Sequence, residues 1–140
     1  MSSIVQKIKK TVSDTVKLPF YTGNSTQLNE VLDNADFSNG GVVYLYQISD
    51  SEFKDGIESM IAAIAFVDLT EFDFDTLEND EIQERLKNTA FEFIIETNKS
   101  NVLQITDVRM QRIYNAYDVN LTGVVIRTTI TEKEGLCDAF

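Results

Sequence analysis

The sequence predicts an α+β fold in which helices pack on one face of an antiparallel or mixed sheet of about four strands. A long β-branched stretch lies at 118–131, and two stretches with helical periodicity lie at 3–17 and 80–97. Further apolar stretches typical of strands lie between them. The resulting order of two helices, two strands, one helix and two strands favours such a sheet, with the helices on one of its faces.

The chain is expected to form a single domain, residues 1–140. A chain of this length can bury roughly two thirds of its unfolded surface in one core. It contains no internal repeat, linker or low-complexity segment. Within the domain, residues 1–17 are predicted as an N-terminal amphipathic helix and residues 18–140 as the α+β core.

The stretch from Asp118 to Thr131 is the clearest β signal, and the rest of the fold is expected to pack on it. Most residues after Gly123 are β-branched, which suits a pleated, half-buried surface. Strand alternation places Val124, Ile126, Thr128 and Ile130 on one face and Val125, Arg127, Thr129 and Thr131 on the other. The first face is expected to be buried and the second solvated.

The N-terminal helix begins with a capping-box spacing, Ser3 to Gln6. Apolar residues then recur at every fourth position, and Pro19 ends the helix. Four lysines against one aspartate make this helix basic within a chain of net charge −11. Such a helix suits the domain's own sheet, an acidic neighbouring subunit or a membrane, and its narrow aliphatic stripe favours packing on protein.

A second, shorter helix is expected around Leu28, Val31 and Leu32. Asn24 or Ser25 is positioned to cap it. Polar residues and glycines then form a turn before the first strand.

Two strands are expected in the next part of the chain. Residues 42–48 are rich in β-branched and aromatic side chains and are predicted as a strand. Residues 49–59 are predicted as a polar loop. Residues 60–69 are apolar throughout, so periodicity permits a buried helix or a strand, and their length and flanking turns favour a central strand.

The most acidic stretch, 71–81, precedes the longest predicted helix. It fails the EF-hand pattern, because Glu78 occupies the position where a calcium loop requires glycine. Asp73 and Asp75 permit a glycosidase-type carboxylate pair, but acidic proteins commonly contain such pairs and this chain has no Trp. We interpret the stretch as a solvated loop whose charge favours the N-terminus of the next helix.

That helix is predicted from 80 to 97. Its apolar residues Ile82, Leu86, Ala90, Phe93 and Ile94 share one face. Residues 90–95 are apolar on more than one side, so we expect burial there both by the domain's own sheet and by another chain.

Between this helix and the C-terminal strand we expect a turn, a strand and a link. Residues 98–101 are predicted as the turn, and residues 102–108 as a strand with weak alternation. Residues 109–117 are polar and aromatic and lead into the C-terminal strand.

Composition argues against several kinds of catalysis. The chain has no His, which removes the usual general base near neutral pH and the commonest zinc ligand. Its single cysteine, Cys137, has no partner within the chain and no His to activate it, and we interpret it as a small buried apolar residue. We therefore expect no enzymatic activity, no metal and no other cofactor.

Charge and hydropathy limit the partners. A net charge of −11 disfavours binding through cationic contacts to phosphates, so no sequence-specific nucleic-acid binding is expected. The N-terminus lacks the apolar core of a signal peptide, and the longest apolar run, 60–67, is too short to span a bilayer. We expect a protein made in a cytoplasm, without membrane association.

Several segments together resemble small neck and tail proteins of crAss-like bacteriophages that infect Bacteroides. They are the short amphipathic start, LPFYTGNSTQLNEVLD at 18–33, VYLYQI at 43–48, FVDLTEFDFD at 66–75 and YDVNLTGVVIRTTITEKEGLC at 117–137. Proteins of this kind are ring or tail-completion proteins stacked between portal and tail. They have no catalytic signature, and a closing D-x-N-L-T-G strand, here Asp118 to Gly123, belongs to their layout.

The resemblance implies a tail-terminator-like α+β fold and no enzymatic activity. It implies a homo-oligomeric ring of six or twelve subunits that contacts adjacent portal, neck or tail ring proteins. The expected function is that of a structural virion protein for head-tail connection or tail completion, through which DNA passes, assembled in the bacterial host cytoplasm. A non-structural adaptor or assembly factor that binds one protein partner is the alternative.

Two sets of residues are candidates for roles in such a ring. Aromatics near turns and termini are candidates for inter-subunit contacts, because ring interfaces tend to bury aromatics and sheet edges, although each is also compatible with packing under a loop of its own subunit. They are Phe20, Tyr21, Tyr114, Tyr117 and Phe140. Three acids, Asp73, Asp75 and Glu78, are candidates for the lumen, where they would repel phosphates and let DNA slide; a solvated outer loop is the alternative.

Overall fold

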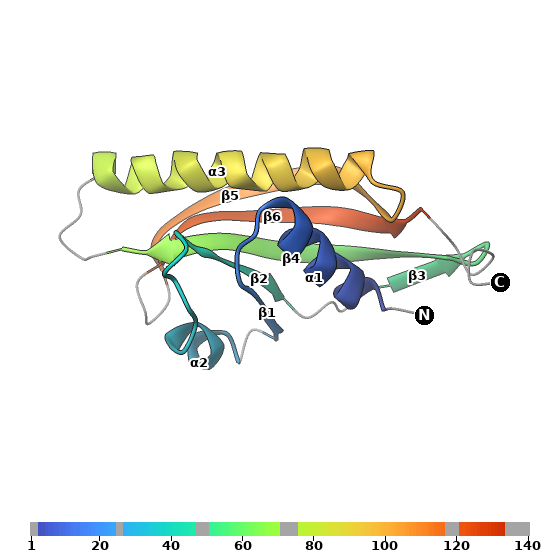
Figure 1. Ribbon diagram of the computed structural model, residues 1–140, viewed down its shortest axis with the longest axis horizontal. Helices are drawn as coiled ribbons and strands as arrows, with labels where there is room; N and C mark the ends of the chain where they lie inside the picture. Colours follow the sequence, from blue (N-terminus) through green and yellow to red (C-terminus); the bar gives the residue numbers. More distant parts are fainter. Residues whose placement is uncertain (1–2, 25–26, 47–50, 71–75, 117–120, 134–140) are drawn as a thin grey trace.

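The computed structural model describes residues 3–24, 27–46, 51–70, 76–116 and 121–133 (Figure 1). These residues form three helices and six strands, which confirms the α+β class. In chain order they are α1 (Ile4–Thr15), β1 (Phe20–Gly23), α2 (Leu28–Asp33), β2 (Val42–Tyr46), β3 (Ser51–Lys54), β4 (Ile57–Leu69), α3 (Thr76–Lys99), β5 (Leu103–Ala116) and β6 (Leu121–Glu132).

All six strands belong to one mixed sheet. Its order is β1-β2-β4-β6-β5, and β3 pairs with the first part of β4. The β1–β2 pair is parallel and the other pairs are antiparallel. The strand predicted at 118–131 is therefore β6, a central strand, and the ambiguous segment 60–69 is the central strand β4.

The sheet is larger than the four strands predicted, in part because residues 51–59 of the expected polar loop belong to a hairpin. Strand β3 turns into β4 through Asp55 and Gly56, both with positive φ, which is the backbone of a tight two-residue turn. The dipeptide Asp-Gly is a strong sequence signal for that turn. The short strand β1 is the other additional strand. Residues 109–116, which were predicted as part of a link, instead extend β5 to Ala116.

The first face of the sheet is covered by α1 and α3. Their buried residues pack against alternate residues of β2, β4 and β6 in one core. The rings of Phe66 in β4 and Phe93 in α3 lie 5.8 Å apart at their centres. Val124, Ile126 and Ile130 are buried in this core, as the alternation of β6 predicts.

Helix α2 covers part of the second face, so the prediction that all helices pack on one face is wrong. Leu28 and Leu32 of α2 form a second core with Tyr44, Ala65 and Val125 from the sheet. The physical reason lies in β2 and β4, which are apolar on both sides and need a cover on each. In Figure 1, α2 lies across the sheet from α3, toward the end of the sheet that is far from the β3–β4 hairpin.

The helix ends follow local sequence signals. Ser3 and Gln6 form the predicted capping box, and α1 ends before Lys17, whose φ is positive. Asn24 accepts a hydrogen bond from the Gln27 amide at 3.0 Å, although the residue at the N-cap of α2 is Gln27; Ser25 lies outside the described residues. Near the start of α3, buried Asn79 accepts hydrogen bonds from the hydroxyls of Thr70, which follows β4, and of Thr122 in β6. These bonds tie α3 to the sheet.

Candidate functional site

The most prominent surface feature is a set of exposed large apolar side chains. In the described part of the chain they are Phe53, Ile61, Leu69, Leu77, Phe91, Ile95, Val102 and Val108. Single exposed apolar residues are ordinary on a protein surface. Those that share a face with one another or with unpaired charges are candidates for contacts with other chains.

One such surface runs along the side of α3 that points away from the sheet. We call it the outer stripe of α3, and it comprises Leu77, Glu81, Glu84, Asn88, Phe91 and Ile95. Their spacing alternates between four and three residues, which keeps them in one row along the helix. Leu77 is 73% exposed and Ile95 is 53% exposed. Phe91 and Ile95 confirm that the second half of this helix is apolar on more than one side. Its burial by another chain stays a prediction.

A second surface is the part of the second face that no described helix covers. We call it the open sheet face, and it comprises Ser59, Ile61, Thr106, Arg109, Arg127, Thr129 and Thr131. Ile61 stands opposite Thr129 and is 61% exposed. The hydroxyls of Ser59 and Thr131 lie 3.0 Å apart and join β4 to β6.

Two arginines stand directly opposite each other on the open sheet face. Arg109 of β5 is the register partner of Arg127 of β6, and both are exposed. Like charges in this position repel each other. Among the described residues neither has a carboxylate within ion-pair distance, whereas Arg85 binds Asp68 at 2.7 Å and Arg112 binds Glu84 at 2.6 Å.

A β-bulge creates this arginine pair. The register of β5 shifts between Thr106 and Arg109, and Asp107 within the bulge has a positive φ. Without the extra residue, Val108 would stand opposite Arg127. Bulges re-aim side chains in this way, and here the bulge brings a second guanidinium onto the open sheet face.

The acidic side chain with the best-defined partners is Glu84, on the outer stripe of α3. Lys87 approaches it at 2.5 Å and Arg112 at 2.6 Å. The hydrogen bond from Lys87, followed by that from Arg112, lowers the pKa of Glu84 from its ordinary value. This carboxylate is therefore engaged within its own subunit.

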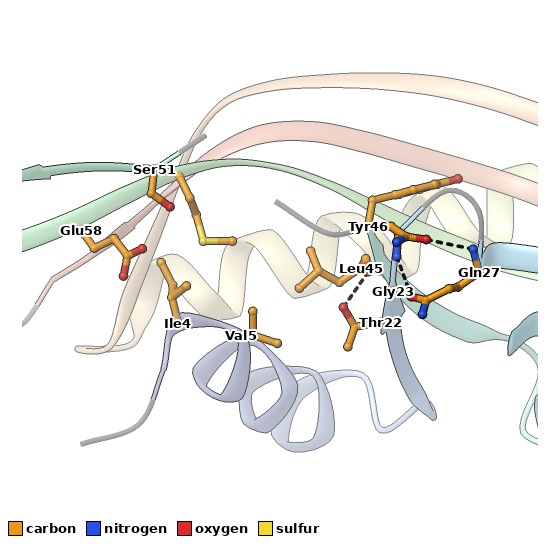
Figure 2. A pocket seen from close by; sticks show the side chains of 11 residues that line it. Ile4, Val5, Thr22, Gly23, Gln27, Leu45, Tyr46, Ser51 and Glu58 are labelled. Carbon is orange, nitrogen blue, oxygen red and sulfur yellow. Dashed lines mark hydrogen bonds between the residues drawn. The ribbon is translucent and has the colours of Figure 1, made fainter. Parts of the chain in front are cut away.

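A groove of about 580 Å³ lies between the start of α1 and the sheet (Figure 2). Its apolar wall includes Ile4, Leu45 and Met60, and Glu58 is the single carboxylate among its described lining residues. Thr22 of β1 donates a hydrogen bond from its hydroxyl to the Leu45 carbonyl of the neighbouring strand β2, at 2.8 Å. The mixed walls suit the binding of a short peptide segment.

The predicted contact aromatics are divided between described and undescribed parts of the chain. Phe20 is half-buried against the first core. Tyr21 is half-buried against the second core, and its hydroxyl accepts from the Asp36 amide at 2.9 Å. Tyr114 lies in β5, but its side chain, like Tyr117 and Phe140, lies outside the described residues. Their role between subunits stays a prediction.

The predicted lumen acids are similarly divided. Glu78 is exposed in the first turn of α3, and Asp73 and Asp75 lie outside the described residues. The arginine pair was not predicted from the sequence, because it depends on a β-bulge. The outer stripe had a readable signal, the alternating four-and-three spacing from Leu77 to Ile95.

The described residues meet neither the requirements of a metal site nor those of a membrane-spanning helix. Within them, no three His, Cys, Asp or Glu side chains converge in a way that would hold a metal ion. None of the helices described is both long and apolar enough to span a bilayer.

No protein-family model matches the chain, and no curated protein matches it significantly.

Proposed function

We propose that this protein is a structural virion protein that forms a homo-oligomeric ring in the neck or tail of a crAss-like bacteriophage infecting Bacteroides. The resemblance of its sequence segments to such proteins supports the virion role. The observation that carries the assembly role is the placement of exposed apolar residues on two different surfaces, the outer stripe of α3 and the open sheet face.

The two surfaces lie on opposite sides of the sheet. Helix α3 covers the first face and turns its outer stripe away from the sheet, while Ile61 lies on the second face. Two different surfaces that complement each other produce a head-to-tail contact, which repeats from subunit to subunit and closes into a ring when the rotation permits. The expected assembly is a six-fold or twelve-fold ring around the DNA.

The assembly role is tested by native mass spectrometry of the purified protein over a range of concentrations. A closed species of six or twelve subunits is the expected result, and a monomer at the highest concentration would contradict the proposal. The virion role is tested separately, by detecting the protein in purified phage particles.

The lumen role of Asp73, Asp75 and Glu78 is a further part of the proposal. An acidic wall repels phosphate, whereas a Lys-rich wall holds it. Changing all three to Lys should leave assembly intact and slow DNA ejection, with a defect that eases as salt screens the new contacts. Normal ejection at low salt would place these residues outside the lumen.

The groove of Figure 2 favours the alternative function, a non-structural adaptor that binds one protein partner. Its apolar wall and polar rim are of the kind that accept a peptide segment. The adaptor predicts a one-to-one complex with a host or phage protein and no presence in purified particles. The ring predicts the reverse on both counts.

A further inference from the structure

We propose that the outer stripe of α3 in one copy of the chain docks on the open sheet face of the next copy. Glu81 then lies against Arg109 and Arg127, and Leu77 lies against Ile61. This interface rests on the ring assembly proposed above and names the surfaces that form it.

Charge complementarity identifies a second copy of the chain as the partner of the open sheet face. The open sheet face carries two adjacent arginines that have no acidic partner in the described residues. The chain has 23 acidic residues against 12 basic ones, so its own surface is a rich source of acidic partners. Among the acids in the first turns of α3, Glu81 is exposed and lies on the outer stripe.

The apolar residues agree with the same pairing. Leu77 has the largest exposed fraction among the large apolar side chains described, at 73%, and Ile61 is exposed to 61%. Each stands next to the charges of its own surface, Leu77 beside Glu81 and Ile61 near Arg127. Burying the two against each other removes from water the apolar area that each surface exposes.

The spacing of the two pairs is similar. Leu77 and Glu81 are one helical turn apart, about 6 Å. Ile61 and Arg127 are diagonal neighbours on adjacent strands, because Ile61 stands opposite Thr129, and such neighbours lie roughly 7–8 Å apart. One turn of helix can therefore present its apolar and acidic residues to both groups at once.

The resulting contact repeats the packing found within each subunit. Inside the subunit, α3 covers the first face of its own sheet. In the assembly, the same helix would also cover the open part of a neighbour's second face, so that helices and sheets alternate around the ring. The interface joins two different surfaces, as a ring requires.

The test uses charge reversal in the full-length protein. One variant is Glu81→Arg, and the other combines Arg109→Glu with Arg127→Glu. Each should assemble at least tenfold more weakly than wild type by native mass spectrometry and analytical ultracentrifugation, because an attraction becomes a repulsion at the interface. Mixed in equal amounts, the two variants should assemble again, because every contact in the mixed ring joins opposite charges.

Matched controls reverse charges elsewhere. Glu30→Arg on α2 changes one exposed acid, and Lys9→Glu with Lys10→Glu on α1 changes two exposed bases. Both controls should assemble as wild type does. Circular dichroism should show native-like melting for all variants. If a reversal variant fails to fold, the milder variants Glu81→Gln and Arg127→Ser replace it and should give smaller losses of assembly.

The outcomes separate this interface from the proposed function. A wild-type protein that stays monomeric overturns both. A wild-type ring that also forms in both reversal variants, or that is not restored on mixing them, overturns this interface and leaves the ring. If the Arg109→Glu, Arg127→Glu variant assembles normally but no longer binds a DNA duplex, the proposed interface is overturned. The two arginines would then bind phosphate instead of a neighbouring subunit.

Discussion

The two faces of the sheet contain residues from the same strands but have different covers. On the first face, α1 and α3 together bury alternate residues of β2, β4 and β6. On the second face, α2 covers only one part of the sheet, and the rest exposes Ile61, Arg109 and Arg127. Neighbours in one strand, such as Ile126 and Arg127, therefore differ completely in burial. The comparison shows that the placement of helices decides which side of a strand is core and which is available to a partner.

Removing the first-face cover should have the largest effect. Deletion of residues 1–17 removes Ile4, Ile8 and Val12, all buried in the first core. Three such side chains contribute about 2 kcal/mol each, or about 6 kcal/mol together, which is comparable with the stability of a small domain. We expect thermal unfolding, followed by circular dichroism, to lose its cooperative transition. A truncated protein that melts cooperatively but no longer assembles would show instead that the helix docks on a neighbour.

The next prediction compares adjacent positions on opposite faces of β6. Ile126→Asp places an unpaired charge in the first core, and we expect a loss of about 4 kcal/mol in the free energy of unfolding. Arg127→Asp changes an exposed residue and also removes the repulsion by Arg109, so its effect should stay within about 0.5 kcal/mol. Urea denaturation of both variants measures the contrast. Similar midpoints for the two would mean that the faces are wrongly assigned.

A close approach between central strands gives a third, smaller effect. A Cβ added at Gly123 would lie 2.0 Å from the Phe66 carbonyl oxygen and 3.0 Å from a methyl of Leu86. Because the nearest atom belongs to the backbone, the strands must separate, and we expect Gly123→Ala to cost about 3 kcal/mol. Thr129→Ala, on the open sheet face of the same strand, is the control and should change stability by less than about 0.5 kcal/mol. An unchanged urea midpoint for Gly123→Ala would contradict the packing of β6 on β4.

The first face was largely predictable from the sequence. Ile4, Ile8 and Val12 repeat with helical spacing behind a capping box, and Val124, Ile126 and Ile130 alternate as a strand requires. Local periodicity is sufficient here, because each element has one apolar side and that side must be buried.

The second face was less predictable, because its features depend on contacts between distant segments. The position of α2 follows from β2 and β4 being apolar on both sides. Residues 60–69 are visibly apolar throughout in the sequence, but nothing local indicates which element covers their second side. The arginine pair requires the register of β5 on β6 and a one-residue bulge at Asp107. Neither the register nor the bulge can be read from alternation alone.

The smallest predicted effect concerns the charges that α3 satisfies within its own subunit. Glu84 accepts hydrogen bonds from Lys87 and Arg112, which lower the pKa of its carboxyl below the ordinary value of 4.5. Because the folded state then binds the proton more weakly than the unfolded state, the contribution of Glu84 to stability is present above pH 4.5 and is lost as the pH falls through the lowered pKa. The melting temperature of wild type should exceed that of Glu84→Gln slightly at pH 7, and the difference should disappear as the pH falls below 4.5 and through the lowered pKa. In a Lys87→Gln background the difference at pH 7 should shrink, since the largest cause of the shift is gone. Added salt should also reduce it, because the group is exposed. A difference that persists unchanged however far the pH falls would assign the effect of Glu84 to packing along α3 instead of to its charge.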